Sequence, residues 1–342
     1  MGALVGNYLI VLATRFGQGW NRFWYTPSDP YPLGVMRIAL GLLLLYLHAT
    51  YTFDLVAFFG PNGLIPTELV ETMRSRVTFN PTYLSYLYAF QDPTALYVVH
   101  AIGAIILVLF TIGFKSRWTC VLALLVSLAY YHRAPFLTSG VEQMSCMMLF
   151  YMCFGPCGAT LSVDRWLALR RAENDPIFAR KLEQQSTSIG ATISIRLIQV
   201  HLSIIYLVMG VAKLSGPAVV TGTGDWVNPW HAGHAVWLLA ARPESPWFDL
   251  TWMAHSPYIF QGWTMAIMVF EIAFGVFIWN RLARPLLLLF AIPMWCSLAL
   301  ISGTAPFCVA MLIAGLAFFS RDMLTEFSPA EGRLETAPAA SG

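Results

Sequence analysis

The sequence predicts an all-α, polytopic membrane protein: a helix bundle with about eight transmembrane helices and both termini in the cytoplasm. The first observation behind this is composition, since 57% of the 342 residues are hydrophobic and only 11% are charged. A typical soluble domain carries roughly 25% charged residues. The second observation is a series of long uncharged runs, and the third is a lopsided distribution of lysine and arginine along the chain.

The uncharged runs locate the expected spans, because a helix needs about 20 mostly apolar residues to cross a bilayer. Such runs cover 93–114, 143–163 and 250–270. The run over 285–320 is long enough for two spans, and the turn-forming sequence ISGTAP divides it near its middle. The expected spans are 33–54, 94–114, 117–132, 143–161, 195–214, 262–280, 284–300 and 304–320.

Basic residues orient these spans. Only five of the 20 lysines and arginines fall in the segments expected on the outer side, namely Arg74, Arg76, Arg133, Lys213 and Arg242. The positive-inside rule therefore places both termini in the cytoplasm and the protein in the cytoplasmic membrane. A net charge of only +2 argues against a nucleic-acid partner.

The chain divides into three parts. Residues 1–24 have an apolar stretch too short to span, followed by arginines and aromatics, and are expected to form an interfacial helix in the membrane plane. Residues 25–327 form the transmembrane domain, in which the charged loop 162–193 is expected to contain one surface helix. Residues 328–342 are expected to be a disordered cytoplasmic tail.

The fifth expected span carries a polar stripe. Its polar and small residues recur at spacings of three and four, which places them on one helical face that must point into the bundle or a cavity. For Gln199 and Ser203, interhelical packing and substrate binding are both open. Tyr206 is a candidate substrate-binding residue. Lys213 lies at the outer end, as a functional base or as a lysine that snorkels to the interface. The stripe consists of Arg196, Gln199, Ser203, Tyr206, Gly210 and Lys213.

Glu271 lies inside the sixth expected span, several residues from either end. An ionisable residue inside a span is costly and is by default a candidate functional residue. One interpretation is an internal ion pair that holds two helices together. The other is a catalytic role, either as a partner of Lys213 or as part of a proton relay.

A second cluster is expected on the outer side, where Tyr130, Tyr131, His132 and Arg133 precede a short loop and Glu142. Histidine is the side chain most often used for proton transfer near neutral pH. His132 is therefore a candidate catalytic residue, with Arg133 and Glu142 as candidate substrate-binding residues. The alternative is a histidine that caps a helix C-terminus at the membrane interface.

The loop over 215–261 is rich in tryptophan and is expected to cover the outer surface as a lid of short interfacial helices. Asp225 with His231 and His234 only loosely resembles a metal-ligand set. No metal is expected.

The ordered set of segments resembles the HTTM family, whose membrane domain is shared with vitamin K-dependent γ-glutamyl carboxylase. The resemblance runs from about residue 20 to residue 320, in order and at similar spacing. The matching segments are FWYTPSDPYPLGVMRIALGLLLLYL (23–47), FFGPNGLIP (58–66), YYHRAPFLTSG (130–140), GATLSVDRW (158–166), IYLVMGVAKLSG (205–216) and FEIAFGVFIWNRLARPL (270–286).

The resemblance implies that Lys213 is the base that deprotonates a reduced, vitamin K-like quinone. The carboxylase has a large C-terminal domain after its membrane domain, whereas this sequence stops soon after the eighth expected span. It also has Ser139, Gly140, Val141 and Glu142 where the carboxylase has a supporting histidine. Glutamate carboxylation is therefore not carried over.

Two functions are expected from the sequence. The first is a carboxylase- or oxygenase-like enzyme that uses Lys213 as base on a quinol or lipid-like substrate, supported by Glu271, His132, Arg133 and Glu142. The second is a non-catalytic membrane protein that binds, exports or confers tolerance to a peptide or lipid. The expected partners are the bilayer and an amphipathic small molecule or peptide.

Overall fold

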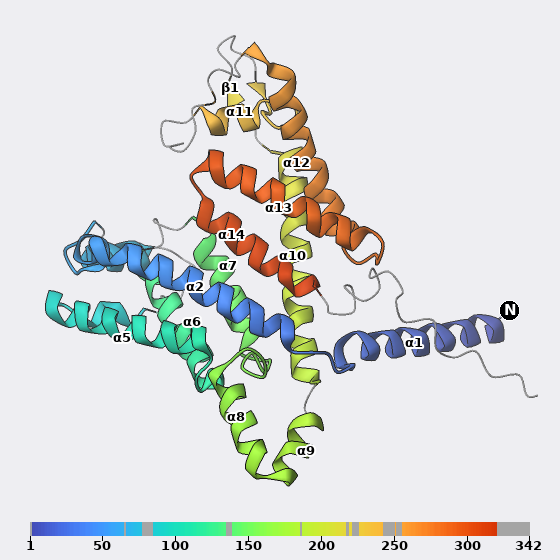
Figure 1. The fold of residues 1–342 in the computed structure, drawn as a ribbon. Helices are drawn as coiled ribbons and strands as arrows, with labels where there is room; N and C mark the ends of the chain where they lie inside the picture. Colours follow the sequence, from blue (N-terminus) through green and yellow to red (C-terminus); the bar gives the residue numbers. More distant parts are fainter. Residues whose placement is uncertain are drawn as a thin grey trace, which may run out of the picture.

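A computed structural model describes residues 2–64, 66–76, 85–134, 139–184, 187–216, 219–220, 226–241, 250 and 255–319. These residues are overwhelmingly helical, with one short antiparallel ribbon of two strands (Figure 1). The elements are α1 Gly2–Tyr25, α2 Tyr31–Phe53, α3 Leu55–Phe59, α4 Thr67–Arg76, η1 Tyr86–Ala89, α5 Pro93–Ile112, α6 Ser116–Arg133, α7 Val141–Met152, α8 Val163–Asn174, α9 Pro176–Gln184, α10 Ile189–Leu214, β1 Val219–Val220, β2 Trp226–Val227, α11 Ala235–Ala240, α12 Pro257–Phe277, α13 Ala283–Ser302, α14 Ala305–Gly315 and η4 Leu316–Phe318.

A helix occupies each of the eight expected spans. Within the described part of the chain, five helices are long and apolar enough to cross a membrane: α2, α5, α10, α12 and α13. The chain is therefore an α-helical protein of membrane-embedded character. Helices α6, α7 and α14 are shorter or less apolar, so the number of crossings and the side of the termini stay predictions.

The expected fourth span, 143–161, is wrong in extent. Helix α7 ends at Met152 and has 12 residues, which gives a length of about 18 Å. The chain then turns through a segment that contains Gly155, Pro156 and Gly158. Glycine and proline favour turns over helix, and a Cβ at Gly158 would meet the Ser116 side chain. Counting apolar residues alone overlooked these helix-ending residues.

A buried arginine ties this turn to α2. The Arg37 side chain is fully buried, and its guanidinium donates to the carbonyl oxygens of Cys157 at 2.8 Å and Leu161 at 2.5 Å. Gly113, at φ +72°, lies against the same guanidinium, where a Cβ would come within 2.5 Å of a nitrogen. Arg37 thus satisfies backbone carbonyls of the turn that follows α7.

The helices form two groups that meet along α7, α10 and α14 (Figure 1). In one group, α2 packs against α5, α5 against α6, and α6 against α7. In the other, α10 packs along α12, and α13 packs against α12 and α14. Helix α14 also contacts α2 and α7, so the last helix joins the two groups.

The segments outside the bundle are partly as expected. Residues 2–25 form one helix, α1, which extends away from the bundle. The single surface helix predicted in 162–193 is wrong, because the chain forms α8 and α9 with a break at Asp175 and Pro176. The Asp175 carboxylate accepts from the amides of Ile177 and Phe178 and so starts a new helix. The predicted tail, 328–342, lies outside the described residues.

Candidate functional site

The polar stripe of α10 faces the bundle. Gln199 and Ser203 are 6% exposed, and Tyr206 is 1% exposed. The Gln199 amide donates to the carbonyl oxygen of Ala317 at 2.7 Å, and the Ser203 hydroxyl donates to the Gln199 carbonyl at 2.9 Å. The Gln199 bond joins α10 to η4, whereas the Ser203 bond lies within α10. A role of either residue in substrate binding stays a prediction.

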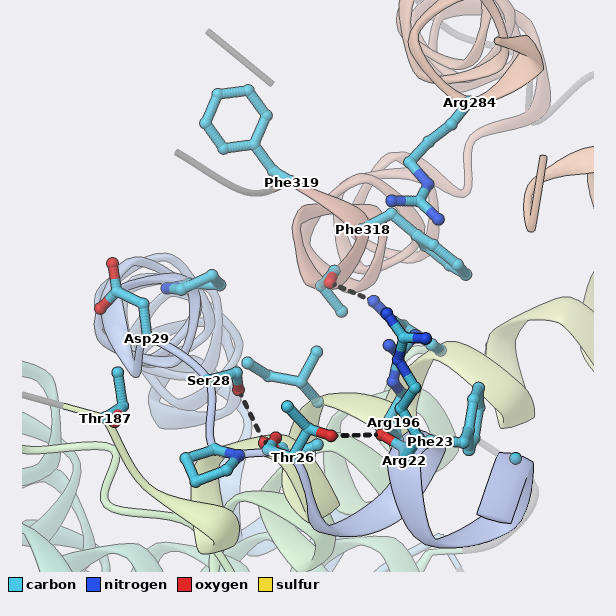
Figure 2. A pocket seen from close by; sticks show the side chains of 17 residues that line it. Arg22, Phe23, Thr26, Ser28, Asp29, Thr187, Arg196, Arg284, Phe318 and Phe319 are labelled. Carbon is cyan, nitrogen blue, oxygen red and sulfur yellow. Dashed lines mark hydrogen bonds between the residues drawn. The ribbon is translucent and has the colours of Figure 1, made fainter. Parts of the chain in front are cut away.

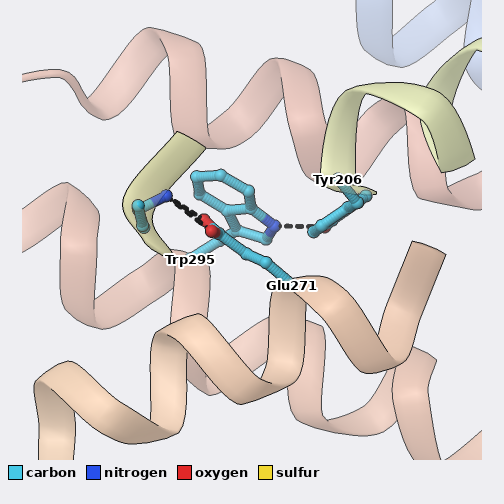
Figure 3. Close-up of polar contacts among 4 residues, drawn as sticks. Tyr206, Glu271 and Trp295 are labelled. Carbon is cyan, nitrogen blue, oxygen red and sulfur yellow. Dashed lines mark hydrogen bonds and ion pairs between the residues drawn. The ribbon is translucent and has the colours of Figure 1, made fainter. Parts of the chain in front are cut away.

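Lys213 and Glu271 form an ion pair between α10 and α12. The Lys213 Nζ lies 2.6 Å from Glu271 Oε1 and 2.5 Å from Oε2 (Figure 3). The Glu271 side chain is fully buried, whereas the Lys213 side chain is 15% exposed. Gly210 permits the close approach, because a Cβ there would come within 2.6 Å of Ile272 Cγ1. One more carbon at this position would therefore push the two helices apart.

The segment after β2 lies over the lysine. The Lys213 Nζ is 4.8 Å from the centroid of the Trp230 ring, within the range of a cation–π contact. Asn228 fixes this segment, because its amide donates to the carbonyl oxygens of Lys213 at 3.1 Å and Gly216 at 3.2 Å. The Asn228 side-chain oxygen in turn accepts from the Trp230 amide at 2.9 Å.

The lid of short helices expected over 215–261 is found in part. Helix α11 packs against α12 and α13. The strands β1 and β2 were not predicted, since each has only two residues. Asp225, Trp247 and Trp252 lie outside the described residues, and across the residues described no group of three His, Cys, Asp or Glu side chains is placed to hold a metal ion.

An aromatic cluster lies beside the ion pair (Figure 3). The Trp295 Nε1 of α13 donates to the Tyr206 hydroxyl at 2.5 Å. The Tyr206 ring stacks on Phe274, with centroids 3.9 Å apart. Tyr206 is a predicted substrate-binding residue, but its hydroxyl is engaged by Trp295. The sequence did not single out Trp295, which lies in an apolar span with no pattern to mark it.

An apolar groove of about 550 Å³ runs between α12 and α13. Pro293 interrupts the hydrogen bonding of α13 at the groove. Ile267, which lies one turn before Glu271 on α12, forms part of its wall. Its remaining lining residues are Trp263, Ala266, Val269, Phe270, Phe290, Met294 and Ser297.

The predicted outer cluster does not converge on Lys213. Arg133 is fully buried, donates to the carbonyl oxygen of Gly60 and lies 5.2 Å from the Tyr88 ring centroid. Glu142 accepts from the Tyr51 hydroxyl at 3.2 Å. These contacts hold α6 and α7 to α2, α3 and η1.

The contacts of His132 and those of Lys213 run to different parts of the bundle. The carbonyl of His132 accepts from the Tyr88 hydroxyl at 3.2 Å. The polar contacts of Lys213 run to Glu271, Trp230 and Asn228. His132, Arg133 and Glu142 lie in the other helix group, and their support of Lys213 stays a prediction.

A buried histidine pair, which the sequence analysis did not single out, lies in that group. The rings of His48 and His100 stack with centroids 3.9 Å apart. The His100 ring is hydrogen-bonded to the Tyr130 hydroxyl at 2.7 Å and the Thr52 hydroxyl at 2.8 Å. A cavity of about 30 Å³ adjoins His48, and the buried hydroxyl of Ser145 lines it.

The comparisons with known proteins give no relative for this chain. No family model, no curated protein and no solved structure matches it.

Proposed function

We propose that this chain is an HTTM-type membrane enzyme that uses Lys213 as the base on a quinol or lipid-like amphiphile. One observation carries the proposal: a buried carboxylate, Glu271, pairs with a partly exposed lysine beneath the Trp230 ring. Intramembrane ionisable residues are rare and usually mark functional sites. The resemblance of residues 205–216 to the lysine segment of the carboxylase points to the same residue.

The proposed chemistry is a single proton transfer. The short contact between the Lys213 Nζ and the Glu271 carboxylate allows one proton to lie on either partner. With the proton on Glu271, Lys213 is a neutral amine and takes the proton of a substrate hydroxyl. The products are a substrate oxyanion and the Lys213 ammonium, whose positive charge then stabilises the oxyanion.

The surroundings suit an amphipathic substrate. The apolar groove between α12 and α13 passes one turn from Glu271 and would hold a hydrocarbon tail. The Trp230 ring lies over the lysine, where a flat quinol ring would stack against it. A reduced naphthoquinone meets both requirements, and in this proposal it is the cofactor.

Oxygen uptake tests the proposal. Purified protein in detergent is mixed anaerobically with a reduced naphthoquinone, and oxygen is then admitted. Deprotonation speeds transfer of two electrons from the quinol to O₂, with quinone and hydrogen peroxide as products. We expect wild type to raise the rate and Lys213→Ala to abolish the rise, whereas Lys115→Ala, at the opposite end of the bundle, retains it. Equal rates for wild type and Lys213→Ala would refute a role for this base.

The competing function is a non-catalytic membrane protein that binds, exports or confers tolerance to a peptide or lipid. It is favoured by the bidentate contact, since both Glu271 oxygens are taken by Lys213. Lys213→Met separates the two functions, because methionine replaces the stem of lysine and removes only the charged end. A structural lysine predicts that Lys213→Met retains function better than Lys213→Ala. A base predicts that both substitutions abolish activity in protein that still folds.

A further inference from the structure

A second cavity lies at the opposite end of α10 from Lys213 (Figure 2). Its volume is about 730 Å³, and it forms where the end of α1, the start of α10, the start of α13 and η4 meet. Arg22 and Phe23 come from α1, Arg196 from α10, Arg284 from α13 and Phe318 from η4. This is within the size range of small-ligand sites.

Three guanidinium groups border this cavity. Figure 2 shows the side chain of Arg284 extending from α13 toward that of Arg196 on α10. The two groups are near enough to interact electrostatically. In the part of the chain that the structure describes, neither Arg22 nor Arg196 forms an ion pair with a carboxylate. Like charges brought together in this way favour a bound anion, which removes their mutual repulsion.

Neutral partners hold Arg196 in place. Its Nη1 donates to Gln199 Oε1 at 2.9 Å, and its guanidinium lies 4.4 Å from the centroid of the Phe23 ring. Neither contact neutralises the charge. A planar guanidinium fixed on an aromatic ring keeps its other donors available for an oxyanion in a bidentate arrangement.

The walls of the cavity are joined by hydrogen bonds between segments far apart in the sequence. Thr192 of α10 donates to the carbonyl oxygen of Thr26 at 2.6 Å. The amide of Ser28 donates to the carbonyl oxygen of Ser188 at 3.3 Å, and the amide of Ser188 donates back to Ser28 at 3.0 Å. The end of α1 is thereby fixed against α10, so the arginines lie on connected elements.

The remaining lining is mixed, with apolar side chains beside the polar residues Thr26, Ser28, Asp29, Thr187, Thr192 and Gln199. Aromatic rings and aliphatic side chains stand beside the arginines, so a ligand that fits has a charged head and a hydrocarbon part. Basic pockets between transmembrane helices bind the headgroups of anionic lipids in this way. The apolar lining residues are Phe23, Pro27, Pro32, Ile195, Phe318 and Phe319.

We propose that this cavity binds an anionic phospholipid, whose phosphate lies among the guanidinium groups of Arg22, Arg196 and Arg284. The acyl chains leave along the aromatic side chains toward the bilayer. The bound lipid then fixes α1 against the start of α10. This site is separate from Lys213 and does not depend on the function proposed for that residue.

Native mass spectrometry of the full chain in detergent tests the proposal. Phosphatidylglycerol is the probe, and phosphatidylcholine is the matched neutral lipid. We expect one phosphatidylglycerol to bind tightly and phosphatidylcholine to bind weakly. Each guanidinium removed is expected to weaken binding roughly tenfold, so Arg22→Gln with Arg196→Gln weakens it about a hundredfold. Arg170→Gln with Arg171→Gln, on the exposed face of α8, removes the same charge as a control and is expected to leave binding within about twofold.

Three results would overturn the proposal. Equal binding of phosphatidylcholine would exclude recognition of the anionic headgroup. Inorganic phosphate that displaces the lipid at similar concentration would show a simple anion site instead. An equal loss in the α8 control would indicate general surface attraction. If the double variant does not fold, Arg196→Lys decides, since it retains the charge and is expected to weaken binding by several-fold through loss of the bidentate contact.

Discussion

Three charged side chains are fully buried, and each meets a partner in the described part of the chain. Arg37 donates to the carbonyl oxygens that follow α7, and Arg133 donates to the carbonyl oxygen of Gly60. Glu271 pairs with Lys213. Removing one member of a buried pair leaves an uncompensated charge, which typically costs about 3–5 kcal/mol. These residues therefore combine a structural role with any functional one.

The first prediction concerns the ion pair. Lys213→Met is expected to lower the free energy of unfolding by about 3 kcal/mol, because Glu271 stays buried without its counter-charge. The double variant Lys213→Met with Glu271→Leu is expected to recover most of that loss, since no buried charge remains. Denaturant titration in detergent measures both. A double variant as unstable as the sum of the two single variants would show that the two residues do not interact.

The second prediction concerns Arg37. Arg37→Met is expected to cost about 3 kcal/mol, because the buried carbonyl oxygen of Cys157 and the partly buried one of Leu161 lose their charged donor. Arg170→Met, on the exposed surface of α8, is the control and is expected to cost less than about 1 kcal/mol. The same titration compares them. Similar losses in the two variants would contradict the role assigned to Arg37.

At the scale of single residues, the sequence predicted what periodicity encodes. The spacing of Gln199, Ser203 and Tyr206 shows that they share a face, and all three are buried. The contact of His48 with His100 was not predictable, because it depends on how α2 packs against α5. The pairing of Lys213 with Glu271 was one of several open interpretations, because the sequence alone does not determine how deep each helix lies in the membrane.

At the scale of elements, close helix approach depends on glycine. Helices α10 and α12 meet at Gly210, and α2 and α5 meet where Gly41 faces Thr111. Small residues at such crossings let helix backbones pack closely in membranes. The ion pair therefore depends on Gly210 as well as on its two charged residues.

The third prediction follows from this contact. Gly210→Val places new atoms against Ile272 and separates α10 from α12 without altering a charge. We expect a loss of about 1–3 kcal/mol in stability and loss of quinol-dependent oxygen uptake. Gly262→Val, on the same helix pair but with open space around it, is the control. Wild-type activity in Gly210→Val would show that the spacing of α10 and α12 is not needed.

Element lengths were predicted less well than element positions. All eight expected spans contain a helix, because apolar runs are a strong signal. The end of α7 and the break at Asp175 depend on local turn chemistry, which an apolar count does not include. The two-residue strands β1 and β2 are below the length at which alternation is detectable.

At the scale of the whole molecule, composition and uncharged runs predicted a helical membrane protein, and the described residues include five helices long and apolar enough to span a bilayer. The topology is the fourth prediction: the uncharged runs give eight crossings, and the basic residues give their orientation. Four spans before Arg171 and a fifth before Trp237 place residues near Arg15 and near Arg171 on the cytoplasmic side, and Trp237 outside. Labelling of single introduced cysteines with an impermeant maleimide in intact cells measures this. Labelling of the sites near Arg15 and Arg171 from outside would show that the orientation is the reverse of the predicted one.

The candidate site was predictable only in part. Lys213 and Glu271 stood out as charges in apolar segments, and the resemblance to the HTTM family gave Lys213 a role. The cavity bordered by Arg22, Arg196 and Arg284 was not predictable, since its arginines come from three helices that meet only in the folded chain.

The central claim is that Lys213 removes a proton from a bound quinol, and an anaerobic absorbance spectrum tests it most directly. A reduced naphthoquinone and its anion absorb at different wavelengths, so the protonation state of the bound molecule is visible without any turnover. We predict the anion in wild type and the neutral quinol in Lys213→Met at the same pH. A neutral quinol bound to wild type, or the anion bound to Lys213→Met, would contradict the role of Lys213 as the base.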